Sequence, residues 1–128
     1  TPLTINGAPE YIAQLLDKLV NNAVEFSEDD QPITITAMQD KNTAIFSISN
    51  IGPALPEEMK DRIFDSMVSL RPQVQQKQPH LGIGLYIARL IAEFHQGKIS
   101  AENWADPSSG KSGVVVIVNM PLLNLDIR

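Results

Sequence analysis

Two stretches of the chain repeat apolar residues at three- and four-residue steps, the spacing that places them on one face of a helix. The first covers residues 9–26 and has Pro9 at its first position, where a missing N–H costs nothing. The second follows a pair of glycines, and we expect Gly97 to end it by taking a left-handed conformation. The apolar positions are Ile12, Leu15, Leu16, Leu19, Val20 and Ala23 in the first stretch, and Leu85, Ala88, Ile91 and Ala92 in the second.

Other segments alternate apolar and polar residues and therefore predict strands joined by tight turns. A short helix is expected before a glutamine-rich segment, residues 65–81. This segment is long and shows no helical or strand periodicity, which predicts a lid. This order of elements predicts an α+β fold: a two-layer sandwich of a mainly antiparallel mixed sheet with about three helices on one face. The expected strands are 33–38, 43–49, 98–104 and a central 114–120, with an extended segment at 1–5 and the short helix at 56–64.

Composition narrows the classes of protein. The 128 residues are enough for one domain, 1–128, and 43% are hydrophobic and 20% charged, as in soluble globular proteins. There is no cysteine, which excludes a disulfide framework, a thiolate nucleophile and a cysteine-held metal, and suits a cytosolic setting. The net charge of −5 argues against a broad nucleic-acid surface, and no apolar run is long enough to span a membrane.

Three polar features are candidates for chemistry. The glycines at 82 and 84 lead into a helix start, whose free N–H groups can hold a phosphate, although a glycine pair alone is more often a tight loop. Asn22 offers a neutral oxygen suited to Mg²⁺ already bound by phosphates, or is simply solvated. Asn50 ends a strand before Gly52-Pro53, where its amide either meets a ligand or only shapes a turn.

Four segments, taken together and in order, resemble the ATP-binding domain of bacterial sensor histidine kinases, in the superfamily that includes DNA gyrase and MutL. They correspond to an asparagine box, a first glycine box, a phenylalanine box and a second glycine box. The segments are LLDKLVNNAVEFS at 15–27, SNIGPALP at 49–56, RIFDSM at 62–67, and GIGLYIA at 82–88 followed by EFHQGKI at 93–99.

The resemblance implies a site for ATP and Mg²⁺. Asn22 would bind the Mg²⁺ that bridges the phosphates, and Asn50 would face the adenine amino group. Gly52 would give the base room, with Ala54 beside it in the same box. At the helix start the backbone amides around Gly82, Ile83, Gly84 and Leu85 would meet the phosphates, beneath an ATP lid formed by residues 65–81.

The resemblance also implies the reaction and its partners. The γ-phosphoryl would pass to a histidine on a separate dimerisation domain, since neither His80 nor His95 is followed by the acidic residue usual at the acceptor. A response regulator receiver domain would be the next partner. The chain would then be a fragment of a larger kinase, a cytoplasmic domain of an inner-membrane sensor, with no nucleic-acid partner and no membrane contact of its own.

Three residues depart from the family pattern and keep alternatives open. Lys18 replaces an asparagine, at the place where hydrolysing relatives carry a glutamate base, and it could instead reach the phosphates from one turn before Asn22. Glu25 replaces a lysine, and Asn50 an aspartate, which turns a charged hydrogen bond into a neutral one. One alternative is a degenerate, non-catalytic nucleotide-binding module, and another is a stand-alone anti-sigma-type serine kinase.

Overall fold

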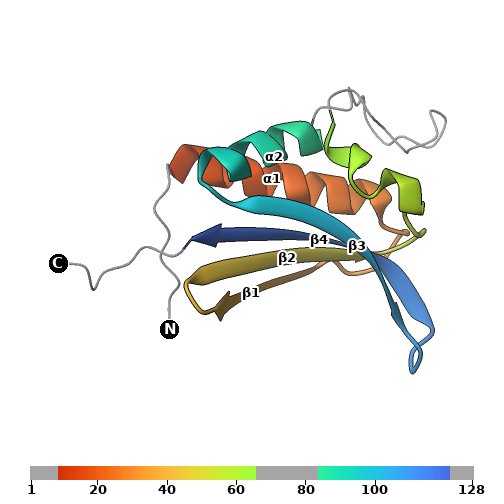
Figure 1. The fold of residues 1–128 in the computed structure, drawn as a ribbon. Helices are drawn as coiled ribbons and strands as arrows, with labels where there is room; N and C mark the ends of the chain where they lie inside the picture. Colours follow the sequence, from red (N-terminus) through yellow and green to blue (C-terminus); the bar gives the residue numbers. More distant parts are fainter. Residues whose placement is uncertain (1–8, 66–83, 122–128) are drawn as a thin grey trace.

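The computed structural model describes residues 9–65 and 84–121, which form one helical layer on one four-stranded sheet (Figure 1). Two α-helices, α1 (Pro9–Phe26) and α2 (Gly84–Phe94), lie over the sheet, and two single 3-10 turns, η1 (Glu57–Met59) and η2 (Arg62–Phe64), stand between them in the chain. The strands are β1 (Thr34–Asp40), β2 (Thr43–Ile51), β3 (Lys98–Asp106) and β4 (Lys111–Pro121). The predicted α+β sandwich is confirmed.

All neighbouring strands of the described sheet are antiparallel, in the order β1-β2-β4-β3. The prediction of a central last strand is confirmed, because β4 pairs with both β2 and β3. Alternate residues of β4 point into the helical layer, and Val114, Val116, Val118 and Met120 are all buried. The described sheet contains no parallel pair, whereas a mixed sheet was predicted. The expected extended segment at 1–5 and the expected lid from residue 66 on lie outside the described residues.

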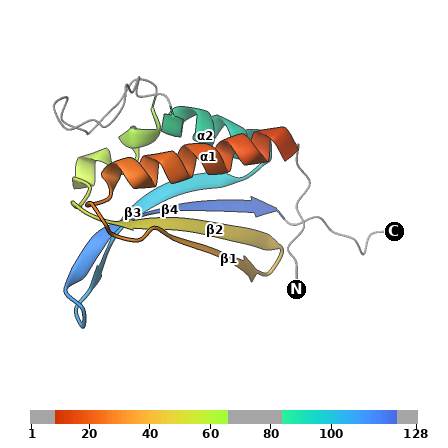
Figure 2. The ribbon, with the colours of Figure 1, turned by 180° about the vertical axis from the view of Figure 1, so that it is seen from behind.

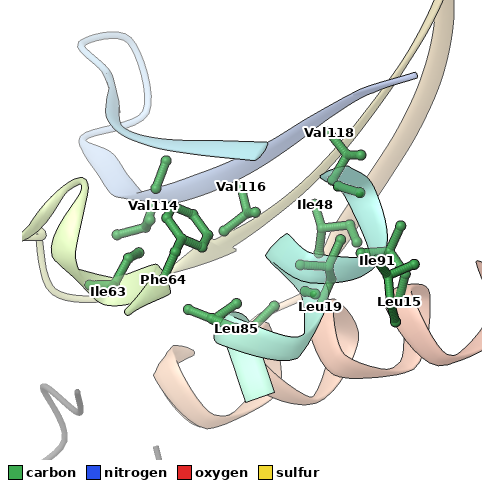
Figure 3. Packing of buried hydrophobic residues seen from close by; sticks show 14 of the residues in the cluster. Leu15, Leu19, Ile48, Ile63, Phe64, Leu85, Ile91, Val114, Val116 and Val118 are labelled. Atoms are coloured by element: carbon green, nitrogen blue, oxygen red, sulfur yellow. The ribbon is translucent and has the colours of Figure 1, made fainter. Parts of the chain in front are cut away.

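The helices pack on β2, β4 and β3 and on each other, and Figure 2 shows β1 at the edge of the sheet farthest from the helices. Every residue of β1 is exposed. Figure 3 shows side chains of α1 and α2 meeting those of the sheet, with Ile63 and Phe64 of η2 in the same cluster. Burial of these apolar side chains is the main favourable term in folding, at roughly 25 cal/mol per Å². None of the described helices combines the length and apolar character needed to cross a lipid bilayer.

Two local predictions are wrong in detail. The expected helix at 56–64 is two separate 3-10 turns, and a kinked chain buries Ile63 and Phe64 without forming a continuous helix. The left-handed residue that ends α2 is Gln96, with φ 64°, and not Gly97. Gly97 is needed for another reason, because a Cβ there would lie 2.3 Å from the carbonyl oxygen of Asn119 in β4.

Figure 1 shows α1 and α2 running in opposite directions, so that the C-terminal end of α1 and the N-terminal end of α2 lie at the same end of the helical layer. The end of β2 is attached there too, since the backbone N–H of Glu28 donates to the carbonyl of Ile51 at 2.8 Å. The described candidate residues lie between the middle of α1, where Lys18 is placed, and this end of the molecule.

Candidate functional site

Three positions on one face of α1 form a line along the candidate site. Lys18, Asn22 and Phe26 follow each other at four-residue steps, which places them on neighbouring turns of the same face. Lys18 and Asn22 are half-buried. With a rise of 1.5 Å per residue, the line is about 12 Å long from Lys18 to Phe26.

Lys18 lies beside the first residue of α2. If a Cβ is placed on Gly84, the nearest described atom is Lys18 Cδ, at 4.0 Å. The start of an α-helix carries unpaired N–H groups and the positive end of the helix dipole. Among the described residues no carboxylate forms an ion pair with Lys18. A lysine stem beside a helix N-terminus brings two positive groups together, which favours a bound anion.

The other end of the line meets the end of β2. Gly52 is buried, and a Cβ added to it would lie 2.5 Å from the carbonyl oxygen of Phe26 and 3.2 Å from Asn50 Nδ2. The glycine at this position is therefore required by the packing of the chain itself. The family resemblance implied a second role for Gly52, to leave room for a purine base. That role stays a prediction.

Asn50 is the buried polar residue of the described core, with 4% of its surface exposed. Its amide nitrogen Nδ2 has no hydrogen-bond partner among the described residues. Its main-chain carbonyl accepts a hydrogen bond from Trp104 Nε1 of β3 at 3.2 Å, which holds this part of β2 in place. The Asn50 side chain therefore lies near Phe26, with an amide N–H donor that no described residue accepts.

The loop after Gly52 is held to the sheet by two side chains of β3. The amide of Asn103 makes two bonds to one residue: its Oδ1 accepts from the backbone N–H of Leu55 at 2.7 Å, and its Nδ2 donates to the Leu55 carbonyl at 2.9 Å. Lys60 binds Glu57 and also Glu102 of β3, and these hydrogen bonds raise the pKa of Lys60. Ala54, in this loop, is exposed.

Replacing Asn103 with alanine is expected to destabilise the protein by about 1–3 kcal/mol, because it leaves the part-buried Leu55 N–H and carbonyl without their partner. Chemical denaturation measures the change. The matched control is Asn42→Ala in the exposed turn before β2, which should change stability little. Equal stability of the two variants would show that Asn103 does not hold the loop.

The remaining candidates are placed as follows. Gly82 and Ile83 lie outside the described residues. Leu85 points into the core, so only its backbone can serve a ligand at the start of α2. Both carboxylate oxygens of Glu25 are buried, so this acid is not presented on an open surface. His95 Nδ1 lies 2.7 Å from the Ile91 carbonyl and donates to it, whereas His80 is not among the described residues.

Asn103 and Trp104 were missed by the sequence reasoning. Both lie within a strand whose alternation of apolar and polar residues gives no sign that their side chains reach a loop and a neighbouring backbone. The signal that could have found Asn103 is an asparagine in a strand, where this residue type is unfavourable unless its amide is used.

A hollow of about 360 Å³ lies away from these residues, between the N-terminal part of α1 and the C-terminal part of α2. It is lined mainly by apolar side chains, among them Tyr11, Leu90 and Phe94. It offers neither the lysine nor the helix N-terminus found beside Gly84, so it is a poor candidate for a phosphate compound.

Comparison with known proteins places this geometry in a family. Residues 7–124 match the family described as histidine kinase-, DNA gyrase B-, and HSP90-like ATPase. The sensor protein ChvG of Agrobacterium fabrum is 34% identical over 122 residues, covering 94% of this chain and 20% of ChvG. The sensory kinase SasA of Prochlorococcus marinus is 41% identical over 87 residues, covering 67% and 23%. The chain thus spans about a fifth of the length of these relatives.

Solved structures agree with the sequence matches. The catalytic domain of histidine kinase ThkA superposes with a TM-score of 0.75 at 34% identity, covering 91% of this chain and 70% of that one. The mycobacterial sensor histidine kinase MprB shares the fold, with a TM-score of 0.81 at 18% identity, covering 98% and 79%. The chain therefore belongs to the histidine kinase-, gyrase B- and HSP90-like ATPase family and corresponds within it to the catalytic ATPase domain of sensor histidine kinases.

Proposed function

We propose that this domain binds ATP together with Mg²⁺ and directs the γ-phosphoryl group to a histidine on a separate dimerisation domain of the same kinase. The observation that carries the proposal is the position of Lys18 beside Gly84 at the start of α2, one turn before Asn22. Lys18 offers a cation, the start of α2 offers free backbone N–H donors, and Asn22 offers a neutral oxygen. A nucleoside triphosphate bound with Mg²⁺ can use all three, the first two for its phosphates and the third for the metal ion.

In this proposal the phosphates bind near Lys18, and the base binds near Phe26. The N–H groups at the start of α2 and the ammonium of Lys18 would bind phosphate oxygens, and Asn22 Oδ1 would hold the cation. Asn50 and Gly52 lie near Phe26, about 12 Å along the helix from Lys18, and would meet the base. Mg²⁺, when bound with ATP, neutralises phosphate charge; the protein supplies positioning, which dominates phosphoryl transfer.

The acceptor and the later partner are part of the proposal. His95 is engaged with the backbone of α2, which fits an acceptor histidine on another domain. A structure of ThkA was solved in complex with the response regulator TrrA, and we propose a response regulator receiver domain as the partner here too. A parent protein located in the inner membrane, with this domain on the cytoplasmic side, remains part of the same proposal. We treat 1–128 as one catalytic domain.

The Gly84→Ala variant tests the phosphate end. Open space at Gly84 among the described residues means that a methyl group should leave stability unchanged or slightly higher. If phosphates approach the backbone here, the same methyl group should weaken binding of an ATP analogue by about tenfold or more, since it occupies their place. Thermal unfolding and calorimetric titration on the same samples give both values.

Gly110→Ala is the control, because it should lower stability and leave nucleotide affinity unchanged, the reverse of what is expected for Gly84→Ala. Gly110 has φ +75° and no atom within 4 Å of an added Cβ among the described residues, so alanine should cost roughly 1 kcal/mol of stability through strain. Because Gly110 lies in the β3–β4 turn, nucleotide affinity should stay unchanged. Unchanged affinity in Gly84→Ala would contradict the proposed phosphate site.

A further inference from the structure

The unused donor of Asn50 is the polar feature of the described core that the fold itself does not explain. The residue has 4% of its surface exposed, and its Nδ2 has no hydrogen-bond partner among the described residues. A buried amide donor left without a partner costs stability, so such groups usually serve a ligand or a water. Trp104 fixes the Asn50 carbonyl, so the strand is not free to turn the side chain out.

The chemistry of an amide differs from that of a carboxylate at this place. A carboxylate only accepts hydrogen bonds, whereas an amide presents one donor and one acceptor side by side. The edge of adenine carries a donor at the 6-amino group and an acceptor at N1. The edge of a 6-oxopurine carries the reverse, an acceptor at O6 and a donor at N1. Turning the amide by 180° exchanges its oxygen and nitrogen, so one asparagine matches either edge.

We infer that Asn50 allows the site to bind 6-oxopurine nucleoside triphosphates as well as ATP. The inference rests on the proposed function, because it takes the base to lie against residue 50. With an aspartate here and the base in the same pose, O6 would face a carboxylate oxygen and the 6-oxopurine would be rejected. The neutral amide removes that repulsion, and its orphaned Nδ2 supplies the donor that O6 requires.

The test compares ATP with inosine triphosphate, which differ only at position 6 and in the proton at N1. Wild type and Asn50→Asp are each titrated with both nucleotides and Mg²⁺ by calorimetry. The wild type should bind the two within about threefold of each other, because two neutral hydrogen-bond pairs have similar strength. Asn50→Asp should prefer ATP by about tenfold or more. Asn42→Asp makes the same chemical change in an exposed turn and should leave the ratio at its wild-type value.

The titrations distinguish failure of 6-oxopurine binding from failure of nucleotide binding as a whole. A wild type that binds ATP but binds inosine triphosphate tenfold or more weakly overturns the inference and leaves the proposed function intact. A wild type that binds neither nucleotide overturns both. If a buried aspartate prevents folding, Asn50→Ala replaces it: the inference expects both nucleotides to weaken by the same factor, and a loss confined to ATP contradicts it.

Discussion

Replacing Asn22 with alanine is expected to abolish the Mg²⁺ dependence of nucleotide binding while the domain stays folded. The side chain is half-buried on the face of α1 that also carries Lys18, and no described side chain depends on it for a hydrogen bond. Alanine is the best helix former, so α1 should be preserved. Loss of a direct ligand should reduce affinity in the presence of Mg²⁺ by about 100-fold, the upper end of what loss of a group supporting a metal costs.

Asn21→Ala is the matched control for this prediction. Asn21 is the neighbouring residue of the same type, is exposed, and contacts Asp17 on the outer face of α1 at 3.3 Å. Calorimetric titrations with and without Mg²⁺ should show a normal metal dependence for Asn21→Ala and none for Asn22→Ala. A normal dependence in both would remove Asn22 from the proposed cation site.

The largest expected effect on stability comes from Gly113→Ala. A Cβ at this residue of β4 would lie 1.9 Å from the carbonyl oxygen of Asn50 and 3.1 Å from the Ile51 Cα, both backbone atoms that no side-chain rotation can move. The two strands must separate, and we expect a loss of about 3 kcal/mol or more in the free energy of unfolding. Because Asn50 moves with its strand, nucleotide affinity should fall as well.

Gly110→Ala again gives the comparison, since it lies in the same β3–β4 hairpin with open space around it. Denaturant unfolding should show a loss several times larger at 113 than at 110. Similar losses at both positions would mean that the close approach of β2 and β4 is not rigid.

The helices and the order of the strands could be predicted because both depend on periodic burial. The spacing of Leu15, Leu19 and Ala23 defines α1, and the continuous apolar run at 114–118 identifies the strand with neighbours on both sides. The segment 56–64 was predicted less well. Its two buried residues, Ile63 and Phe64, satisfy a helix and a pair of 3-10 turns equally, and packing against α2 decides between them.

In the candidate site, too, local motifs predicted some features, and tertiary contacts decide the others. The motifs indicated Lys18, Asn22, Asn50 and Gly84, and the structure brings Lys18 to Gly84, and Asn50 to Gly52. What the motifs could not provide is the reason for each glycine: Gly52 is required by the Phe26 carbonyl, whereas Gly84 faces open space. The supports from Asn103 and Trp104 depend on contacts between residues about fifty positions apart, which no local pattern contains.

The central claim is that ATP binds with Mg²⁺ along the part of α1 that carries Lys18, beside Gly84, and Asn22, one turn further on. Calorimetric titration of the domain with a non-hydrolysable ATP analogue, with and without Mg²⁺, tests it most directly. The account predicts saturable binding at a single site that is strengthened by Mg²⁺, and this Mg²⁺ dependence disappears in Asn22→Ala. No binding at millimolar nucleotide in the presence of Mg²⁺ would contradict it and would leave the degenerate, regulatory module as the better description.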